Sequence, residues 1–77
     1  MEYSELIAKL NELHPEVDFE TEDKLIDRSI LDSFDVVTLV AELGAEYDVA
    51  IPAGRIVPEN FNSARAMFEM IQQLEDE

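Results

Sequence analysis

Cysteine is absent from the 77 residues of this chain, which excludes disulfide bonds and thiolate metal sites. Glycine occurs only twice and proline three times, a scarcity that favours helices with short turns. Five basic residues face 19 acidic ones, giving a net charge of −14. That charge repels phosphate backbones and anionic lipids, so we expect neither nucleic acid nor membrane as a direct partner. It would attract proteins with basic patches, although simple solubility would also account for it.

Long apolar runs are also missing, and none approaches the roughly 20 residues of a membrane span, so we expect no membrane insertion. The first ten residues, MEYSELIAKL, are acidic and amphipathic, unlike the basic start of a secretory signal. We therefore expect a cytoplasmic protein. No repeat or linker divides the chain, which predicts a single domain over residues 1–77.

Apolar residues recur at helical spacing in three stretches, predicting helices over 2–13, over 33–47 and after Ser63. The segment PENF predicts a fourth, short helical turn. The connection 14–31 is rich in apolar residues, so we expect it to fold over the helices, with one helical turn at 21–26. The predicted fold class is all-α: a small irregular four-helix bundle with three main helices, one short helix and a long loop between helices one and two.

The core face predicted for the helix over 33–47 carries Val36, Val40, Leu43 and Tyr47, which cluster at about 100° per residue. Phe34, Val37 and Ala41 lie on another sector, where a helix with one buried stripe needs no apolar residues. Either the long loop covers these side chains or they are available to a partner.

Sites for metal binding or catalysis are not apparent in the residue pattern. The only histidine, His14, precedes a proline at a predicted helix end, where a surface position beside the helix C-terminus is expected. The acidic residues do not follow a calcium-loop spacing, and the sequence around Ser33 is not the glycine-flanked elbow of serine hydrolases. We therefore expect no metal site and no intrinsic active site.

Ser33 stands at the predicted start of the second helix. Asp32 is a favourable N-cap and Asp35 follows three positions later, which predicts a capping box and leaves the serine hydroxyl free. A phosphodiester on that hydroxyl would be tolerated at the positive end of the helix. An unassisted serine is a poor nucleophile, so the base for such an attachment would come from another enzyme. Alternatively, the aspartate–serine pair only begins a helix.

The stretch LIDRSILDSFDVVTLVAELGAEYDVAIP resembles the core of the acyl carrier protein and peptidyl carrier protein family, and PENFNS resembles the start of that family's last two helices. The resemblance implies a non-catalytic monomer in which Ser33 carries 4′-phosphopantetheine, attached from coenzyme A by a phosphopantetheinyl transferase. The arm would hold acyl or aminoacyl groups as thioesters, loaded by a ligase and passed to a downstream acceptor enzyme. The alternative is a non-covalent acidic helical protein-binding module that lacks the arm. The partner surface implied on this chain comprises Asp32, Phe34, Asp35, Val37, Thr38 and Ala41.

Several positions depart from the family pattern. Thr38 and Ala41 make the implied partner surface smoother and less charged, which favours an aminoacyl or peptidyl carrier, such as a stand-alone D-alanyl carrier, over a fatty-acid or polyketide carrier. Ser29 and Asp48 stand where the family commonly has glycine, which puts a left-handed backbone at those positions in doubt. Gly44 lies inside the second helix and is expected to loosen its C-terminal half.

Overall fold

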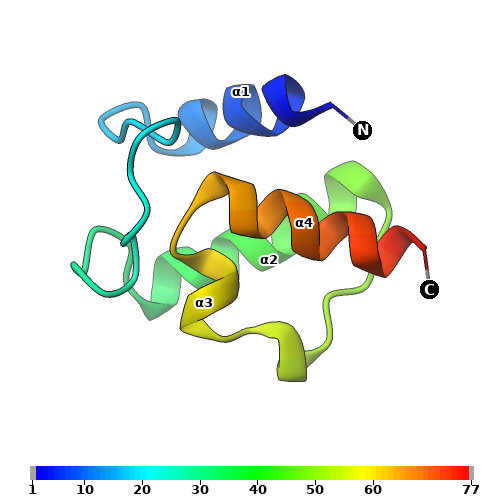
Figure 1. Cartoon of the computed structure of the whole chain (residues 1–77). Coiled ribbons are helices and arrows are strands. Elements are labelled where there is room, and N and C mark those ends of the chain that lie inside the picture. Colours follow the sequence, from blue (N-terminus) through cyan, green and yellow to red (C-terminus); the bar gives the residue numbers. More distant parts are fainter. Residues whose placement is uncertain (1, 77) are drawn as a thin grey trace.

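The computed structural model describes residues 2–76, so both ends of the predicted domain, Met1 and Glu77, lie outside the described residues. Within this range the chain is all-helical, with no strand (Figure 1). The main helices are α1 (Tyr3–Leu13), α2 (Ser33–Tyr47) and α4 (Ala64–Glu75); shorter elements are the 3-10 turn η1 (Ala53–Arg55) and α3 (Pro58–Phe61). The predicted bundle of three main helices and one short helix is confirmed, whereas η1 was not predicted.

The helices begin where local sequence favours it. The Ser63 hydroxyl accepts a hydrogen bond from the Ala66 backbone N–H at 3.0 Å and thereby caps α4. Pro58 occupies the first turn of α3, where its missing N–H costs nothing. Helix α4 contacts both α1 and α3, so it joins the first part of the chain to the last (Figure 1). None of the helices between residues 2 and 76 combines the length and apolar composition that a bilayer crossing requires.

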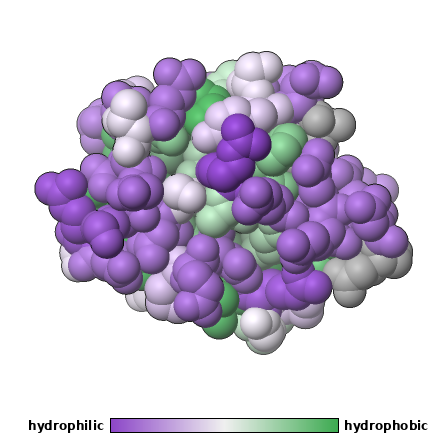
Figure 2. Space-filling model, viewed as in Figure 1, coloured by the Kyte–Doolittle hydropathy of each residue, from purple (hydrophilic) through white to green (hydrophobic). Residues whose placement is uncertain are grey.

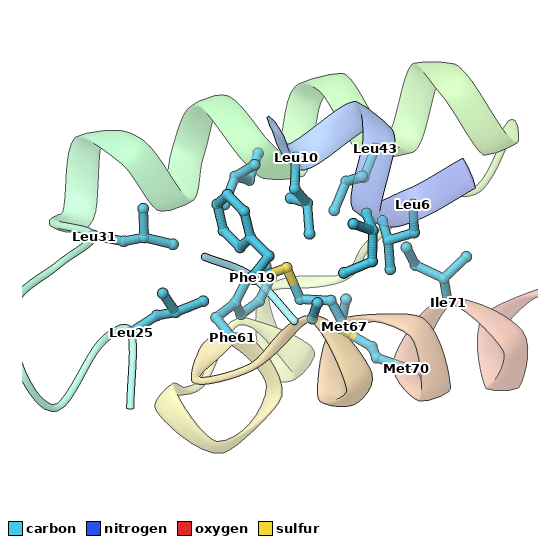
Figure 3. Packing of buried hydrophobic residues seen from close by; sticks show 13 residues of the cluster. Leu6, Leu10, Phe19, Leu25, Leu31, Leu43, Phe61, Met67, Met70 and Ile71 are labelled. Carbon is cyan, nitrogen blue, oxygen red and sulfur yellow. The ribbon is translucent and has the colours of Figure 1, made fainter. Parts of the chain in front are cut away.

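One hydrophobic core fills the space between α2 and α4 (Figure 3). Its buried residues come from α1, the long connection, α2, α3 and α4: Leu6, Ile7, Leu10, Phe19, Leu25, Leu31, Leu39, Leu43, Phe61, Ala64, Met67, Met70 and Ile71. Each fully buried leucine or phenylalanine side chain stabilises the fold by about 1.5–3 kcal/mol. The long connection supplies Phe19, Leu25 and Leu31, which confirms that it folds over the helices.

Two details of the prediction need correction. The predicted Leu43 is buried, and Val36, Val40 and Tyr47 pack partly buried against the core, but the prediction missed Leu39, which is fully buried one turn before Leu43. The face is wider than one stripe because the loop and α4 both pack against the helix. The helical turn expected at 21–26 lies further along, since the Arg28 N–H donates to the Lys24 carbonyl at 2.8 Å.

Two residues without glycine's freedom adopt the left-handed conformation, Ser29 with φ 58° and Asp48 with φ 53°. The question raised by the sequence is thus answered. The backbone is left-handed at both positions, although this conformation is sterically unfavourable for residues other than glycine. At the end of α2, Val49 donates its N–H to the Gly44 carbonyl at 3.1 Å. A Cβ added to Gly44 would lie 3.0 Å from the Val49 carbonyl oxygen, so glycine permits this close return of the chain.

Candidate functional site

Ser33 is the first residue of α2 and is exposed. The predicted capping box is present: the Asp32 Oδ1 accepts the Asp35 N–H at 2.8 Å, and the Asp35 Oδ2 accepts the Asp32 N–H at 3.2 Å. Asp32 therefore satisfies the helix end without help from the serine. Among residues 2–76 the Ser33 hydroxyl makes no hydrogen bond. A free hydroxyl thus stands at the positive end of a 15-residue helix.

The turn that leads into α2 is held by Asn62, a residue that sequence reasoning missed. Its side-chain oxygen accepts the backbone N–H groups of Ile26 at 2.9 Å and Asp27 at 3.1 Å. Its backbone carbonyl accepts the Leu25 N–H at 2.9 Å. In the sequence, Asn62 is only a polar residue directly after PENF. Nothing near it in the chain indicates that it would bond to residues of the distant loop. Asn62 thereby links the end of α3 to the loop that leads to Ser33.

An apolar groove of about 440 Å³ opens beside Ser33. Its walls include Val36 and Val37 of α2, Ile56 of the segment after η1, and the buried Phe61 of α3. The loop contributes Leu31. A molecule bound to the serine would meet this largely apolar surface first.

An apolar patch, formed by Phe34, Val37 and Ile56, lies exposed at the edge of the groove, with 76%, 66% and 39% of each residue accessible. The suggestion that the long loop covers Phe34 and Val37 was wrong, because both side chains remain largely exposed. Elsewhere, hydrophilic side chains cover most of the face shown in Figure 2. Ile56 was missed because it lies in an irregular segment without helical periodicity.

The remaining predicted partner residues lie around this patch. Ala41 is exposed one turn beyond Val37, and Thr38 is half-buried with its hydroxyl donating to the Phe34 carbonyl at 3.1 Å. Asp32 is exposed, whereas Asp35 is partly covered. The structure therefore brings all six predicted partner residues to one region around Ser33, together with Ile56.

His14 occupies the C-terminal cap of α1, where its N–H donates to the Leu10 carbonyl at 2.9 Å. Its position beside a helix C-terminus was predicted correctly, but its ring is largely covered. The ring Nε2 lies 3.7 Å from the Asp35 Oδ1, and the Nδ1 lies 3.4 Å from the Glu16 Oε1. No group of three or more histidine, aspartate or glutamate side chains suited to a metal ion occurs within residues 2–76.

Comparison with known proteins extends these observations. No protein-family model matches the chain, and no solved structure matches it. The D-alanyl carrier protein of Streptococcus mutans is 31% identical over 72 residues, which span 92% of this chain and 91% of that protein. Aminoacyl carrier protein 2 of Bradyrhizobium diazoefficiens is 41% identical over 54 residues, 70% of this chain and 60% of that protein.

The similarity to the D-alanyl carrier extends over nearly the full length of both chains. The chain belongs to the carrier-protein family that includes the aminoacyl and D-alanyl carrier proteins.

Proposed function

We propose that this chain is a cytoplasmic, monomeric carrier that holds an aminoacyl group as a thioester on 4′-phosphopantetheine attached to Ser33. The observation that carries the proposal is the exposed, unbonded Ser33 hydroxyl at the start of α2. The names of the relatives support an aminoacyl rather than a fatty-acyl cargo. When bound, the prosthetic arm supplies the thiol that this cysteine-free chain lacks.

The residues around Ser33 fit such a group. The positive end of α2 favours the negative charge of a phosphodiester, and the apolar groove offers a surface for uncharged parts of the arm. No side chain among residues 2–76 accepts the Ser33 hydroxyl proton. The base that removes this proton during attachment would therefore belong to the phosphopantetheinyl transferase, and the chain itself would catalyse nothing.

The partner surface in this proposal is the apolar patch together with Asp32, Asp35, Thr38 and Ala41. Exposed apolar side chains with an acidic rim suit enzymes whose docking sites combine an apolar contact with basic residues. The transferase, the loading ligase and the acceptor enzyme would use this surface in turn. Salt should weaken these associations, because the net charge of −14 contributes to encounter.

The proposal is tested by incubating the protein with coenzyme A and a broad-specificity phosphopantetheinyl transferase. Mass spectrometry should show the addition of one phosphopantetheine, absent in Ser33→Ala. Ser4→Ala, which removes an exposed serine on α1, is the matched control and should be modified normally. No mass gain in the wild-type chain would favour the non-covalent binding module instead.

The cargo is tested on the modified protein. Aminoacyl ligases with their amino acids, including D-alanine, should load it to a thioester that hydroxylamine releases. Loading only by a malonyl transferase would contradict the aminoacyl assignment and favour a fatty-acid or polyketide carrier.

A further inference from the structure

The groove beside Ser33 has two walls that come from distant parts of the chain. One wall is formed by the long loop and α2, with Ile26 and Val36, and Ser33 lies on this side. The other wall is formed by the segment after η1 and by α3, with Ile56 and Phe61. The shape of the groove therefore depends on how the two walls are fixed to each other.

Asn62 bonds one wall to the other. It directly follows Phe61 at the end of α3, and its hydrogen bonds reach three consecutive residues of the loop. The side-chain oxygen accepts the N–H of Ile26 at 2.9 Å and that of Asp27 at 3.1 Å. The backbone carbonyl accepts the N–H of Leu25 at 2.9 Å. Bonds to three neighbouring residues fix the orientation of the loop as well as its distance from α3.

The turn that Asn62 holds continues directly into the start of α2. The Leu25 carbonyl accepts the N–H of Ile30 at 2.9 Å and that of Leu31 at 3.0 Å, so the turn is closed by its own backbone. Leu31 is buried in the core, and Ser33 follows two positions later as the first residue of α2. The position of the Ser33 hydroxyl relative to α3 therefore depends on the bonds of Asn62.

The apolar patch also extends over both walls, because Phe34 and Val37 belong to α2 whereas Ile56 follows η1. An enzyme that docks on this patch contacts both sides of the groove at once. Its active site then meets Ser33 at a position that the spacing of the two walls determines. That position affects the rate strongly, since a misplacement of a reacting group by about 1 Å can slow a reaction about 100-fold.

We infer that Asn62 is a positioning residue for the attachment of phosphopantetheine to Ser33. The inference rests on the proposed function, because it concerns the reaction of that serine. In attachment the Ser33 oxygen bonds to the phosphorus that carries the pantetheine of coenzyme A. The bond from this phosphorus to the bridging oxygen breaks, adenosine 3′,5′-bisphosphate leaves with that oxygen, and the serine proton passes to a base of the transferase. Asn62 touches none of these groups and acts only by holding the loop that leads to the serine.

The test is steady-state kinetics of phosphopantetheine transfer with two substitutions of nearly equal size. Asn62→Leu removes the acceptor and should lower kcat about fivefold to tenfold, while KM changes less than about twofold because the apolar patch is intact. Asn62→Asp keeps an oxygen acceptor in the same place and should bring kcat within about twofold of the wild-type value. An ionic strength of about 0.3 M screens the added charge of the aspartate. If Asn62→Leu does not fold, Asn62→Ala replaces it with the same expected result.

Two control variants separate positioning from folding and from docking. Ile71→Val removes a buried methyl group from α4, outside the lining of the groove, and so lowers stability without changing the site. Its kcat and KM should equal those of the wild type, with urea unfolding showing that each variant is folded under assay conditions. Phe34→Ala should raise KM with kcat unchanged, which is the opposite pattern to that of Asn62→Leu.

An unchanged kcat in folded Asn62→Leu would overturn the inference alone, and so would an equal loss of kcat in Asn62→Asp. A rise in KM in place of the loss of kcat would also overturn it, because Asn62 would then act in docking. Absence of any mass gain in the wild-type chain, while another carrier protein is modified in the same assay, would overturn the proposed function and this inference with it. The two failures are therefore distinguishable.

Discussion

The side-chain oxygen of Asn62 lies 2.9 Å from the backbone nitrogen of Ile26, although the two residues are 36 positions apart. The same oxygen accepts the Asp27 N–H at 3.1 Å, and the Asn62 carbonyl accepts the Leu25 N–H at 2.9 Å. Asn62, the residue that directly follows α3, therefore holds the turn that precedes Ser33.

Replacing Asn62 with alanine should lower the free energy of unfolding by about 1–3 kcal/mol, because the partly buried N–H of Ile26 and the exposed N–H of Asp27 lose their acceptor. Hydrogen exchange at the amides of Ile26 and Asp27 should accelerate more than exchange in α1. Asn11→Ala, at an exposed position on α1, is the matched control and should change stability by less than about 0.5 kcal/mol. Unchanged protection at Ile26 would show that Asn62 does not hold the turn.

The substitution Gly44→Ala should not increase the stability of the protein, although alanine is a better helix former than glycine. Glycine inside a helix ordinarily costs about 1 kcal/mol relative to alanine. Here the added Cβ would lie 3.0 Å from the Val49 carbonyl oxygen, so we expect stability to fall by about 1 kcal/mol instead. Ala45→Gly, at the exposed neighbouring position, should cost about 1 kcal/mol through propensity alone. A higher urea midpoint for Gly44→Ala would contradict this explanation.

The looser C-terminal half expected of α2 stays a prediction. Amides in the last turn before Tyr47 should exchange faster than those in the middle of α1, and equal protection would count against it.

Glycine at Asp48 should stabilise the protein by about 0.5–1 kcal/mol, because aspartate is held there at φ 53° and ψ 48°. Removing a negative charge from the C-terminal end of α2 should also help. Asp48→Asn separates these causes, since it removes the charge and keeps a Cβ. We expect thermal unfolding to show the larger gain for glycine; no gain in either variant would mean that the turn is unstrained.

Tyr47 should contribute to the loss of stability in alkali. Burial, followed by the charges of Glu46, Glu5 and Glu75, raises the pKa of its phenol above the ordinary tyrosine value. The folded state then holds this proton more tightly than the unfolded chain does. The contribution is complete below about pH 10 and is lost as pH rises through the folded pKa. Urea unfolding across this range should show a shallower decline for Tyr47→Phe; parallel declines would refute the assignment.

We expect Phe34 to contribute to the binding of partner enzymes and very little to the stability of the fold. Because it is 76% exposed, Phe34→Ala should change stability by less than about 0.5 kcal/mol. The same truncation at the buried Phe61 should cost about 3–5 kcal/mol. Under the proposed function, Phe34→Ala should also raise KM for phosphopantetheine transfer while the urea midpoint stays constant. An unchanged KM would remove Phe34 from the partner surface.

Features that depend on near neighbours in the chain could be predicted from the sequence. Helical spacing located α1, α2 and α4, and the caps at Asp32 and Ser63 are present because each bonds a backbone group three residues away. The position of Ser33 at an exposed helix start followed from the same local pattern. The family resemblance added the function that this position implies.

Contacts between distant residues were decided only by the tertiary structure. Spacing within α2 could not show that Leu39 would be central in the core, because the width of its buried face depends on the loop and on α4. The bonds of Asn62 to the loop and the approach of His14 to Asp35 likewise join segments separated by many residues. The sequence by itself therefore determined which serine is presented and how its helix begins. Long-range packing decided how that serine is held and which acidic and apolar groups surround it, because such packing leaves no periodic pattern along the chain.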